Sequence, residues 1–205
     1  MMTRPSDSHT TGNIRANADR LDDQLLVGGA LSPAEMVARA QLDDLRAKGV
    51  TDILDCRIEW SDEDLVADHA PSMRYHHLGV DDDGGRQPLE WWRTGLEIAH
   101  QVLAEPDASL LVHCHMGVNR GPSMAFAVLV DVLDMEPVEA YRLIRTRRPQ
   151  AYAIYAVDGL RAIRTLGNRS IRSADIPALR EHMAQDHTDA DIIATIGRIR
   201  RAEAR

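Results

Sequence analysis

The segment Leu110–Ser123 (LLVHCHMGVNRGPS) holds a cysteine and an arginine in one short loop. Cys114 directly follows an apolar run, and Arg120 stands six residues later at the start of a helical pattern. A loop between a strand and a helix N-terminus points successive backbone N–H groups into one concavity that binds anions. The helix dipole and the planar guanidinium of Arg120 add positive charge. Because this field stabilises a thiolate, we expect Cys114 to attack a bound phosphoryl group.

The backbone of this loop is predicted to hold the phosphoryl group. Gly117 lets the chain turn tightly enough to close the concavity. The predicted phosphate-binding residues are His115, Met116, Gly117, Val118, Asn119 and Arg120. His113 and Ser123 are predicted to support the loop from behind. Three consecutive residues, His113 to His115, cannot easily converge on one ion, so we predict no metal and no cofactor.

The HCxxGxxR pattern resembles the signature loop of the cysteine-dependent protein phosphatases, and HCHMGVNRGPS is most similar to the dual-specificity phosphatase family. The resemblance covers about residues 22–166. The family's first strand is similar to QLLVGGALSP, and a following strand is similar to GVTDILDC. Its closing helix is similar to MEPVEAYRLIRTRRP. The resemblance implies hydrolysis of phosphate monoesters, on phosphotyrosine and/or phosphoserine/threonine proteins, through a phosphocysteine intermediate. Phosphoinositides and nucleotides stay open as substrates.

Cleavage of a phosphate ester also needs a proton for the leaving oxygen. The resemblance implies that an aspartate on a loop after a strand supplies it. Asp81, Asp82 and Asp83 stand together in such a place, and matching YHHLGVDD to the family pattern favours Asp82. The alternative for this DDDGG segment is a solvated turn or a weak cation site.

Two departures from the family pattern lead to a second hypothesis. The family usually has Ser or Thr after the arginine, and its hydroxyl helps the thiolate leave; here Gly121 takes that position and Ser123 lies two residues further on. The family's asparagine that braces the loop has no equivalent in RPQAYAIYAVDGL. The alternative is therefore a phosphate-binding, pseudophosphatase-like module with slow or no turnover. If phosphoenzyme hydrolysis limits the rate, Gly121→Ser is expected to raise it.

Cys56 ends a second apolar run, VTDILDC. The carboxyl ends of parallel strands lie side by side, so Cys56 is expected near Cys114. This resembles the backdoor cysteine of some dual-specificity phosphatases, which traps an oxidised nucleophile as a disulfide. The alternative is a buried structural cysteine.

Composition limits the partners. The 205 residues carry a formal net charge of −8, which opposes bulk attraction to nucleic acid or to an anionic membrane. Two cysteines fit a reducing compartment, and we see neither a leader nor a membrane-spanning run, so a cytoplasmic location is expected. The expected partners are phosphorylated proteins or small phosphoesters, and the expected state is a monomer or weak dimer.

Hydrophobic patterns predict the elements. Strands are expected over residues 24–29, 50–56, 74–80 and 109–113. Helices are expected over residues 33–48, 89–103, 120–133, 137–147, 157–166, 176–185 and 189–201. Alternation of helices with short apolar strands predicts an α/β fold, with a central mixed, largely parallel sheet flanked by helices. We expect a flexible arm over residues 1–20, the phosphatase-type domain over 21–166 and a helical extension over 167–205.

Three further groups have structural interpretations. Arg145, Arg147 and Arg148 are expected to form a solvated helix end, with contact to acidic substrate residues as the alternative. Three tryptophans are expected to serve in packing, with recognition as the alternative: Trp60, Trp91 and Trp92. Four isoleucines are expected to dock the last helix on the domain, with a dimer contact as the alternative: Ile192, Ile193, Ile196 and Ile199.

Overall fold

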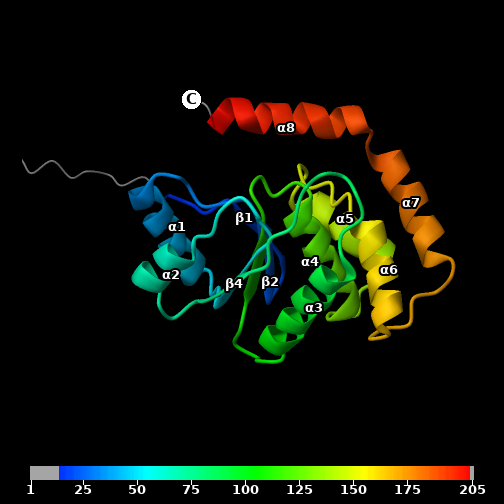
Figure 1. Ribbon diagram of the computed structural model, residues 1–205, viewed down its shortest axis with the longest axis horizontal. Coiled ribbons are helices and arrows are strands. Elements are labelled where there is room, and N and C mark those ends of the chain that lie inside the picture. The colour runs from blue at the N-terminus through cyan, green and yellow to red at the C-terminus, as the bar shows by residue number, and fades with distance from the viewer. Residues whose placement is uncertain (1–13, 204–205) are drawn as a thin grey trace, which may run out of the picture.

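A five-stranded sheet lies at the centre of the computed structural model, which describes residues 14–203 (Figure 1). The strands are β1 (Ala18–Asp22), β2 (Leu25–Gly28), β3 (Asp52–Asp55), β4 (Arg74–His77) and β5 (Leu110–His113). Their order across the sheet is β1-β2-β5-β3-β4. The β1–β2 pair is antiparallel and the other pairs are parallel, which confirms the predicted mixed, largely parallel sheet.

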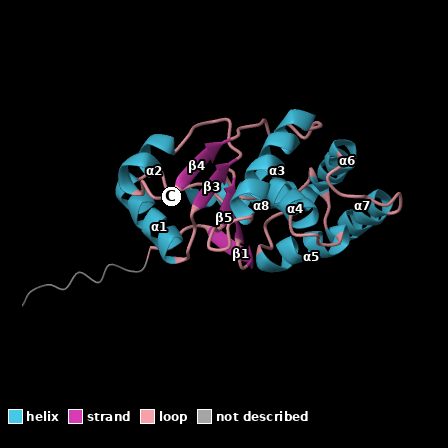
Figure 2. Ribbon diagram, turned by 90° about the horizontal axis from the view of Figure 1, so that it is seen from below, coloured by secondary structure: helices cyan, strands magenta, loops and turns pink. Residues whose placement is uncertain are grey.

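Eight helices surround the sheet within the described residues. They are α1 (Glu35–Ala47), α2 (Glu63–His69), α3 (Leu89–Leu103), α4 (Arg120–Asp131), α5 (Pro137–Arg147), α6 (Ala156–Leu166), α7 (Asp175–Asp186) and α8 (Asp189–Glu203). α1 and α2 lie on one side of the sheet, and α3 to α6 lie on the other (Figures 1 and 2). None of the helices between residues 14 and 203 is long and apolar enough to cross a bilayer.

Alternating side chains build a core on each face of the sheet. Leu25 and Val27 of β2 join the cluster beneath α3 to α6, whereas Leu26 between them joins the cluster beneath α1 and α2. β5 is buried throughout, because neighbouring strands and both layers cover it, and its first three residues are apolar. α4 is buried along nearly its whole length and contacts α3, α5, α6, β2 and β5. This packing fixes the loop between β5 and α4.

Two elements, β1 and α2, lie in segments where we predicted neither a strand nor a helix. Residues 18–20, assigned to the N-terminal arm, lie in β1; residues 1–13 of that arm lie outside the described part of the chain. α1 begins at Glu35 with Ala34 as its N-cap, two residues later than the expected start at residue 33. In the C-terminal extension, Ile176 and Leu179 of α7 join the main core. The domain boundary at residue 166 stays a prediction.

Candidate active site

A cavity of about 440 Å³ opens at the carboxyl end of the parallel strands, where α/β folds commonly bind ligands. Cys114 is one of its lining residues and is 2% exposed. The loop after β5, the Asp81–Asp83 segment and α8 enclose it. The lining residues are Glu59, Asp81, Asp82, Asp83, Cys114, His115, Met116, Val118, Asn119, Arg120, Ile196 and Arg200. The three predicted catalytic residues therefore share one cavity.

The loop after β5 is tightly folded around Gly117. Gly117 has φ +65°, and a Cβ there would lie 2.4 Å from Arg148 Nη2 and 2.6 Å from the Gly28 carbonyl oxygen. Both the left-handed backbone and the close approach require glycine. Five of the six residues predicted to bind phosphate line the cavity, while Gly117 shapes its backbone.

Arg148 braces this loop from behind. Its guanidinium is 1% exposed; Nε donates to the Gly117 carbonyl (2.9 Å) and Nη2 to the Met116 carbonyl (3.3 Å). Nη1 bonds Asp19 at 2.7 Å, so β1 holds the arginine in place. The expectation of a solvated helix end is wrong for Arg148, because buried loop carbonyls need a donor and Arg148 supplies it.

Arg120 begins α4 and is held by an ion pair that the sequence analysis missed. Its two Nη atoms donate to Glu59 Oε2 (2.9 Å) and Oε1 (2.7 Å), and Nη1 also donates to the Val80 carbonyl (2.9 Å). The Arg120 guanidinium lowers the pKa of Glu59 below its ordinary value, so Glu59 is a carboxylate at neutral pH. Arg120 is 3% exposed, and its Nε has no hydrogen-bond partner among the described residues.

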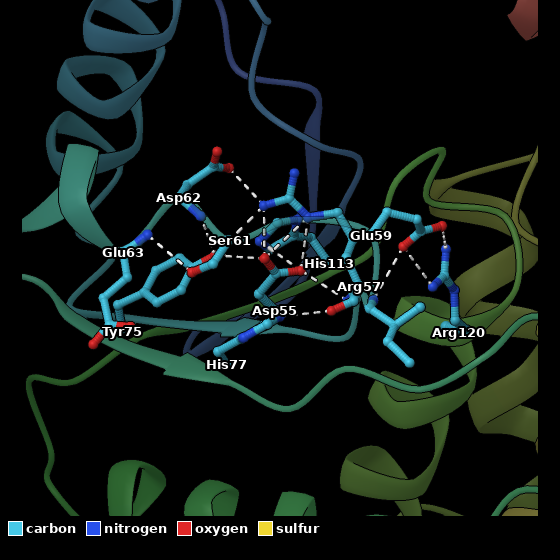
Figure 3. Close-up of polar contacts among 11 residues, drawn as sticks. Asp55, Arg57, Glu59, Ser61, Asp62, Glu63, Tyr75, His77, His113 and Arg120 are labelled. Atoms are coloured by element: carbon cyan, nitrogen blue, oxygen red, sulfur yellow. Dashed lines mark hydrogen bonds and ion pairs between the residues drawn. The ribbon is translucent and has the colours of Figure 1, made fainter.

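A buried network positions the segment that carries Glu59 (Figure 3). Arg57 is fully buried; its Nη2 donates to Asp55 Oδ2 and to Asp62 Oδ2, both at 2.6 Å. The Tyr75 hydroxyl donates to Asp55 and accepts from the backbone N–H of Asp62. The segment after β3 is therefore fixed by charge-assisted bonds at both of its ends.

Asp82 lies over the phosphate loop. Its Oδ1 accepts from the Tyr155 hydroxyl (2.8 Å), and Asn119 Nδ2 lies 3.4 Å from both carboxylate oxygens. Arg120 Nε lies 3.8 Å from Asp82 Oδ2. Tyr155 also accepts from the backbone N–H of Gly84 at 3.0 Å. Asp81 and Asp83 line the same cavity, but these contacts to Asn119, Arg120 and Tyr155 belong to Asp82.

His113 and Ser123 both lie behind the loop. His113 is 2% exposed, its Nε2 lies 3.7 Å from Asp55 Oδ1, and burial lowers its pKa, so the ring is neutral at neutral pH. The Ser123 hydroxyl accepts from the backbone N–H of Tyr155 at 3.1 Å. Ser123 therefore joins α4 to the segment that holds Asp82.

Gly121 packs directly against the backbone before the nucleophile. A Cβ at this position would lie 2.8 Å from the His113 carbonyl carbon and 2.9 Å from the Cys114 nitrogen. The expectation that Gly121→Ser simply adds a useful hydroxyl conflicts with this geometry, because the serine Cβ would displace the loop.

Cys56 and Cys114 end neighbouring strands. Asp55 of β3 pairs with His113 of β5, so the two cysteines follow paired residues, and both belong to one buried cluster. Burial raises the pKa of the Cys56 thiol well above its ordinary value, which keeps it protonated. The redox role of Cys56 stays a prediction.

The last helix, α8, runs across the top of the fold in Figure 1. Ile196 and Arg200 line the cavity, while Ile193 is 70% exposed. The helix is anchored instead by Thr195, which is 2% exposed and lies 3.0 Å from the Tyr152 hydroxyl. The expectation that the isoleucine stripe docks α8 is thus wrong for Ile193, whereas the half-buried Ile196 faces the cavity.

Comparisons with solved structures place this site in a known fold. PTPMT1 is 20% identical, with a TM-score of 0.53, over 82% of this chain and 95% of that one. Human DUSP28 is 18% identical, with a TM-score of 0.60, over 74% and 95% of the two chains. The human tyrosine phosphatase-like serine/threonine/tyrosine-interacting protein is 16% identical, with a TM-score of 0.56, over 73% and 97%. The fold is that of the dual-specificity phosphatases. This confirms the resemblance drawn from the loop.

Sequence comparison gives a narrower match to the dual-specificity phosphatases. Over 82 residues the chain is 28% identical to dual specificity protein phosphatase 16 of Homo sapiens. These residues are 40% of this chain and span only 12% of that relative. No protein-family model matches the sequence.

Proposed function

We propose that this chain hydrolyses phosphate monoesters on proteins, at phosphotyrosine and/or phosphoserine/threonine, through a phosphocysteine intermediate. The observation that carries the proposal is the shared cavity, which Cys114, Arg120 and Asp82 all line, with Arg120 Nε 3.8 Å from Asp82 Oδ2. Nucleophile, anion-binding group and proton donor are the three parts that this reaction needs.

In the first step the Cys114 thiolate attacks phosphorus and the ester P–O bond breaks. Backbone N–H groups of residues 115–120 and the Nε of Arg120 hold the phosphoryl oxygens; that Nε is free of the Glu59 pair. Asp82 gives its proton to the leaving oxygen. The products are a free alcohol and a phosphoryl group bonded to sulfur.

In the second step Asp82, now a carboxylate, takes a proton from water as the water oxygen attacks phosphorus. The P–S bond breaks, inorganic phosphate leaves, and the Cys114 thiolate returns. Tyr155 and Asn119 hold Asp82 in place for both steps. One group thus serves as acid and then as base, and protons balance over the cycle.

The substrate class rests on the cavity and on the relatives. A solved structure shows PTPMT1 in complex with PI(5)P, a phosphoester, which supports a phosphoester ligand here. Four carboxylates line this cavity beside Arg120 and Arg200. They disfavour a substrate with several phosphate groups, because like charges repel at this distance. A cytoplasmic location and a monomeric or weakly dimeric state stay predictions.

One observation favours the second candidate, a phosphate-binding module with slow turnover. Gly121 brings no hydroxyl to the thiolate, and the Ser123 hydroxyl is engaged by the Tyr155 backbone. Such a module would bind phosphate in the same loop and release product slowly.

A substrate panel separates the two candidates. Wild type and Cys114→Ser are compared on an aryl phosphate and on phosphotyrosine, phosphoserine and phosphothreonine peptides. The proposal predicts turnover by wild type, none by Cys114→Ser, and phosphate binding by both. Binding without turnover by wild type would favour the module, and activity in Cys114→Ser would remove Cys114 from its role.

A further inference from the structure

A second cavity, of about 1150 Å³, opens beside the catalytic one between α1, α2 and the segment after β3. Its apolar lining includes Leu31, Pro33, Ala38, Trp60 and Leu65. We call this cavity the α1–α2 groove. His115, the residue after the nucleophile, lines both the groove and the catalytic cavity.

We propose that the α1–α2 groove binds the residues flanking the phosphorylated side chain of a protein substrate, and that it selects substrates carrying arginine or lysine there. The inference rests on the proposed function and names the substrate class that the site would take.

Two aromatic rings at the boundary between the two cavities can contact the side chains of a bound peptide. The Trp60 ring meets the His115 ring edge-on at a centroid distance of 5.0 Å, and Trp60 is 43% exposed. Trp60, expected from the sequence to serve in packing, does pack against His115 and Arg57, and it leaves part of its surface exposed. A large aromatic surface beside the phosphate loop offers contact to apolar and cationic side chains alike.

Charge gives the groove its selectivity. Four carboxylates line it, from Glu35, Asp62, Asp64 and Asp68, against one guanidinium, from Arg39. Arg39 is already paired, at 2.8 Å with Glu35 and at 2.7 Å with Asp68. Asp62 is paired with the buried Arg57 at 2.6 Å.

Asp64, in the exposed first turn of α2, forms no ion pair with any residue from 14 to 203. A basic peptide would supply that missing cation, whereas an acidic peptide would be repelled.

The groove also has the necessary size. Cavities of about 300–1,000 Å³ enclose a drug-sized ligand, so a groove of about 1150 Å³ has room for several residues of an extended chain. The catalytic cavity, at about 440 Å³, takes the phosphorylated side chain alone. The two together fit a peptide with its phosphorylated residue at one end of the bound segment.

The test compares phosphotyrosine peptides of equal length in a neutral alanine and glycine background. One peptide carries two arginines before the phosphotyrosine, and another carries them after it. For each of these, two matched peptides carry glutamates or serines at the same positions. The inference predicts that at least one arginine peptide exceeds its serine counterpart in kcat/KM by about three- to tenfold at low salt. The glutamate peptide should fall below both.

Two variants examine the groove itself. In the double variant Asp64→Asn/Asp68→Asn the preference for arginine should fall to nearly one, and Asp64→Lys should favour the glutamate peptide. Glu63→Gln is the matched control, because Glu63 is exposed on the same helix and does not line the groove. All three should hydrolyse an aryl phosphate at the wild-type rate.

The failures are distinguishable. If wild type hydrolyses the aryl phosphate but shows no arginine preference, or if the preference survives in both groove variants, the inference is wrong and the proposed function stands. If wild type hydrolyses no phosphoester, the proposed function fails. In that case, fluorescence anisotropy measures how tightly Cys114→Ser binds each peptide, which tests the groove without any turnover. Equal affinity for the arginine and serine peptides would overturn the inference about the groove.

Discussion

In the proposed reaction, Glu59 and the phosphoryl group contact the same arginine. Glu59 accepts hydrogen bonds from both Nη atoms of Arg120, at 2.9 and 2.7 Å. Because this ion pair restricts the guanidinium, we expect less side-chain entropy to be lost when a phosphoryl group binds at the Nε side of Arg120.

Asp82→Asn tests the proposed proton donor. We expect the variant to lose about 10²- to 10⁴-fold in kcat on a phosphoester with a poor leaving group, and much less on one with a good leaving group. The reason is that an amide cannot protonate the leaving oxygen. Rates are measured over a series of aryl phosphates with Asp81→Asn and Asp83→Asn as controls. Leaving-group dependence in one of those controls would move the role to that residue.

Gly121→Ser tests the packing beneath the nucleophile. The new Cβ would come within 2.8 Å of the His113 carbonyl carbon, so the loop must shift. We expect the midpoint of thermal unfolding to fall, with a destabilisation of about 1–3 kcal/mol, and turnover to fall as well. Ser123→Ala, which leaves this contact intact, serves for comparison. Faster turnover in Gly121→Ser at unchanged stability would contradict the geometry.

At the scale of elements, β3 and β4 are joined by a buried carboxylate. Asp52 is fully buried; it accepts from Arg74 at 2.8 and 2.9 Å and lies 2.9 Å from His76 Nε2. Burial alone would raise the pKa of Asp52, but the hydrogen bonds from His76 and Arg74 outweigh it and lower the pKa from 3.8 to about 2.

This lowered pKa predicts a pH-dependent stability. Because the folded state holds the Asp52 proton less tightly than the unfolded state, its stabilisation is complete above pH 4 and is lost as the pH falls towards 2. Asp52→Asn should therefore lower the free energy of unfolding by about 1–2 kcal/mol at pH 7, and the gap from wild type should close towards pH 2. Urea unfolding of wild type and Asp52→Asn at several pH values measures this difference in the free energy of unfolding. A gap that stays constant with pH would contradict the assignment.

The position of α8 against the domain depends on a small number of side-chain contacts. Thr195 and the Asp191 carbonyl both lie against the Tyr152 hydroxyl, at 3.0 and 3.3 Å. Thr195→Val should raise the equilibrium constant for local opening of α8 about fivefold, as expected for the loss of one buried hydrogen bond. The global free energy of unfolding should change little. Amide hydrogen exchange over residues 189–200 reports the opening, and Ile193→Val at an exposed position is the control. Equal exchange in both variants would mean that other contacts hold the helix.

Over the whole molecule, the features that could be predicted from the sequence are those formed by one continuous segment of the chain. The loop from Cys114 to Arg120 is one continuous segment, so its chemistry and its place after a strand could be predicted together. The apolar runs of β2, β3 and β5 likewise reveal buried strands. β1 and α2 were missed because they are short and polar, and their stability comes from neighbours.

The missed parts of the site come from elsewhere in the chain. Glu59, Arg148 and Tyr155 reach the loop from three separate segments, and their residue types alone give no signal of that contact. Ile196 and Arg200 arrive only because α7 turns the chain so that α8 borders the cavity (Figure 1). Such contacts follow from tertiary packing, which a pattern of hydrophobic residues does not specify.

The central claim is that Cys114 carries the phosphoryl group during turnover. Wild-type protein and the Cys114→Ser variant are mixed with a phosphotyrosine peptide, quenched in acid within the first turnover, and digested for mass spectrometry. The account predicts a phosphoryl group on the peptide containing Cys114 in wild type and none on the same peptide of the variant. Product release by wild type with Cys114 unmodified at every time, or with the phosphoryl group on another residue, would contradict it.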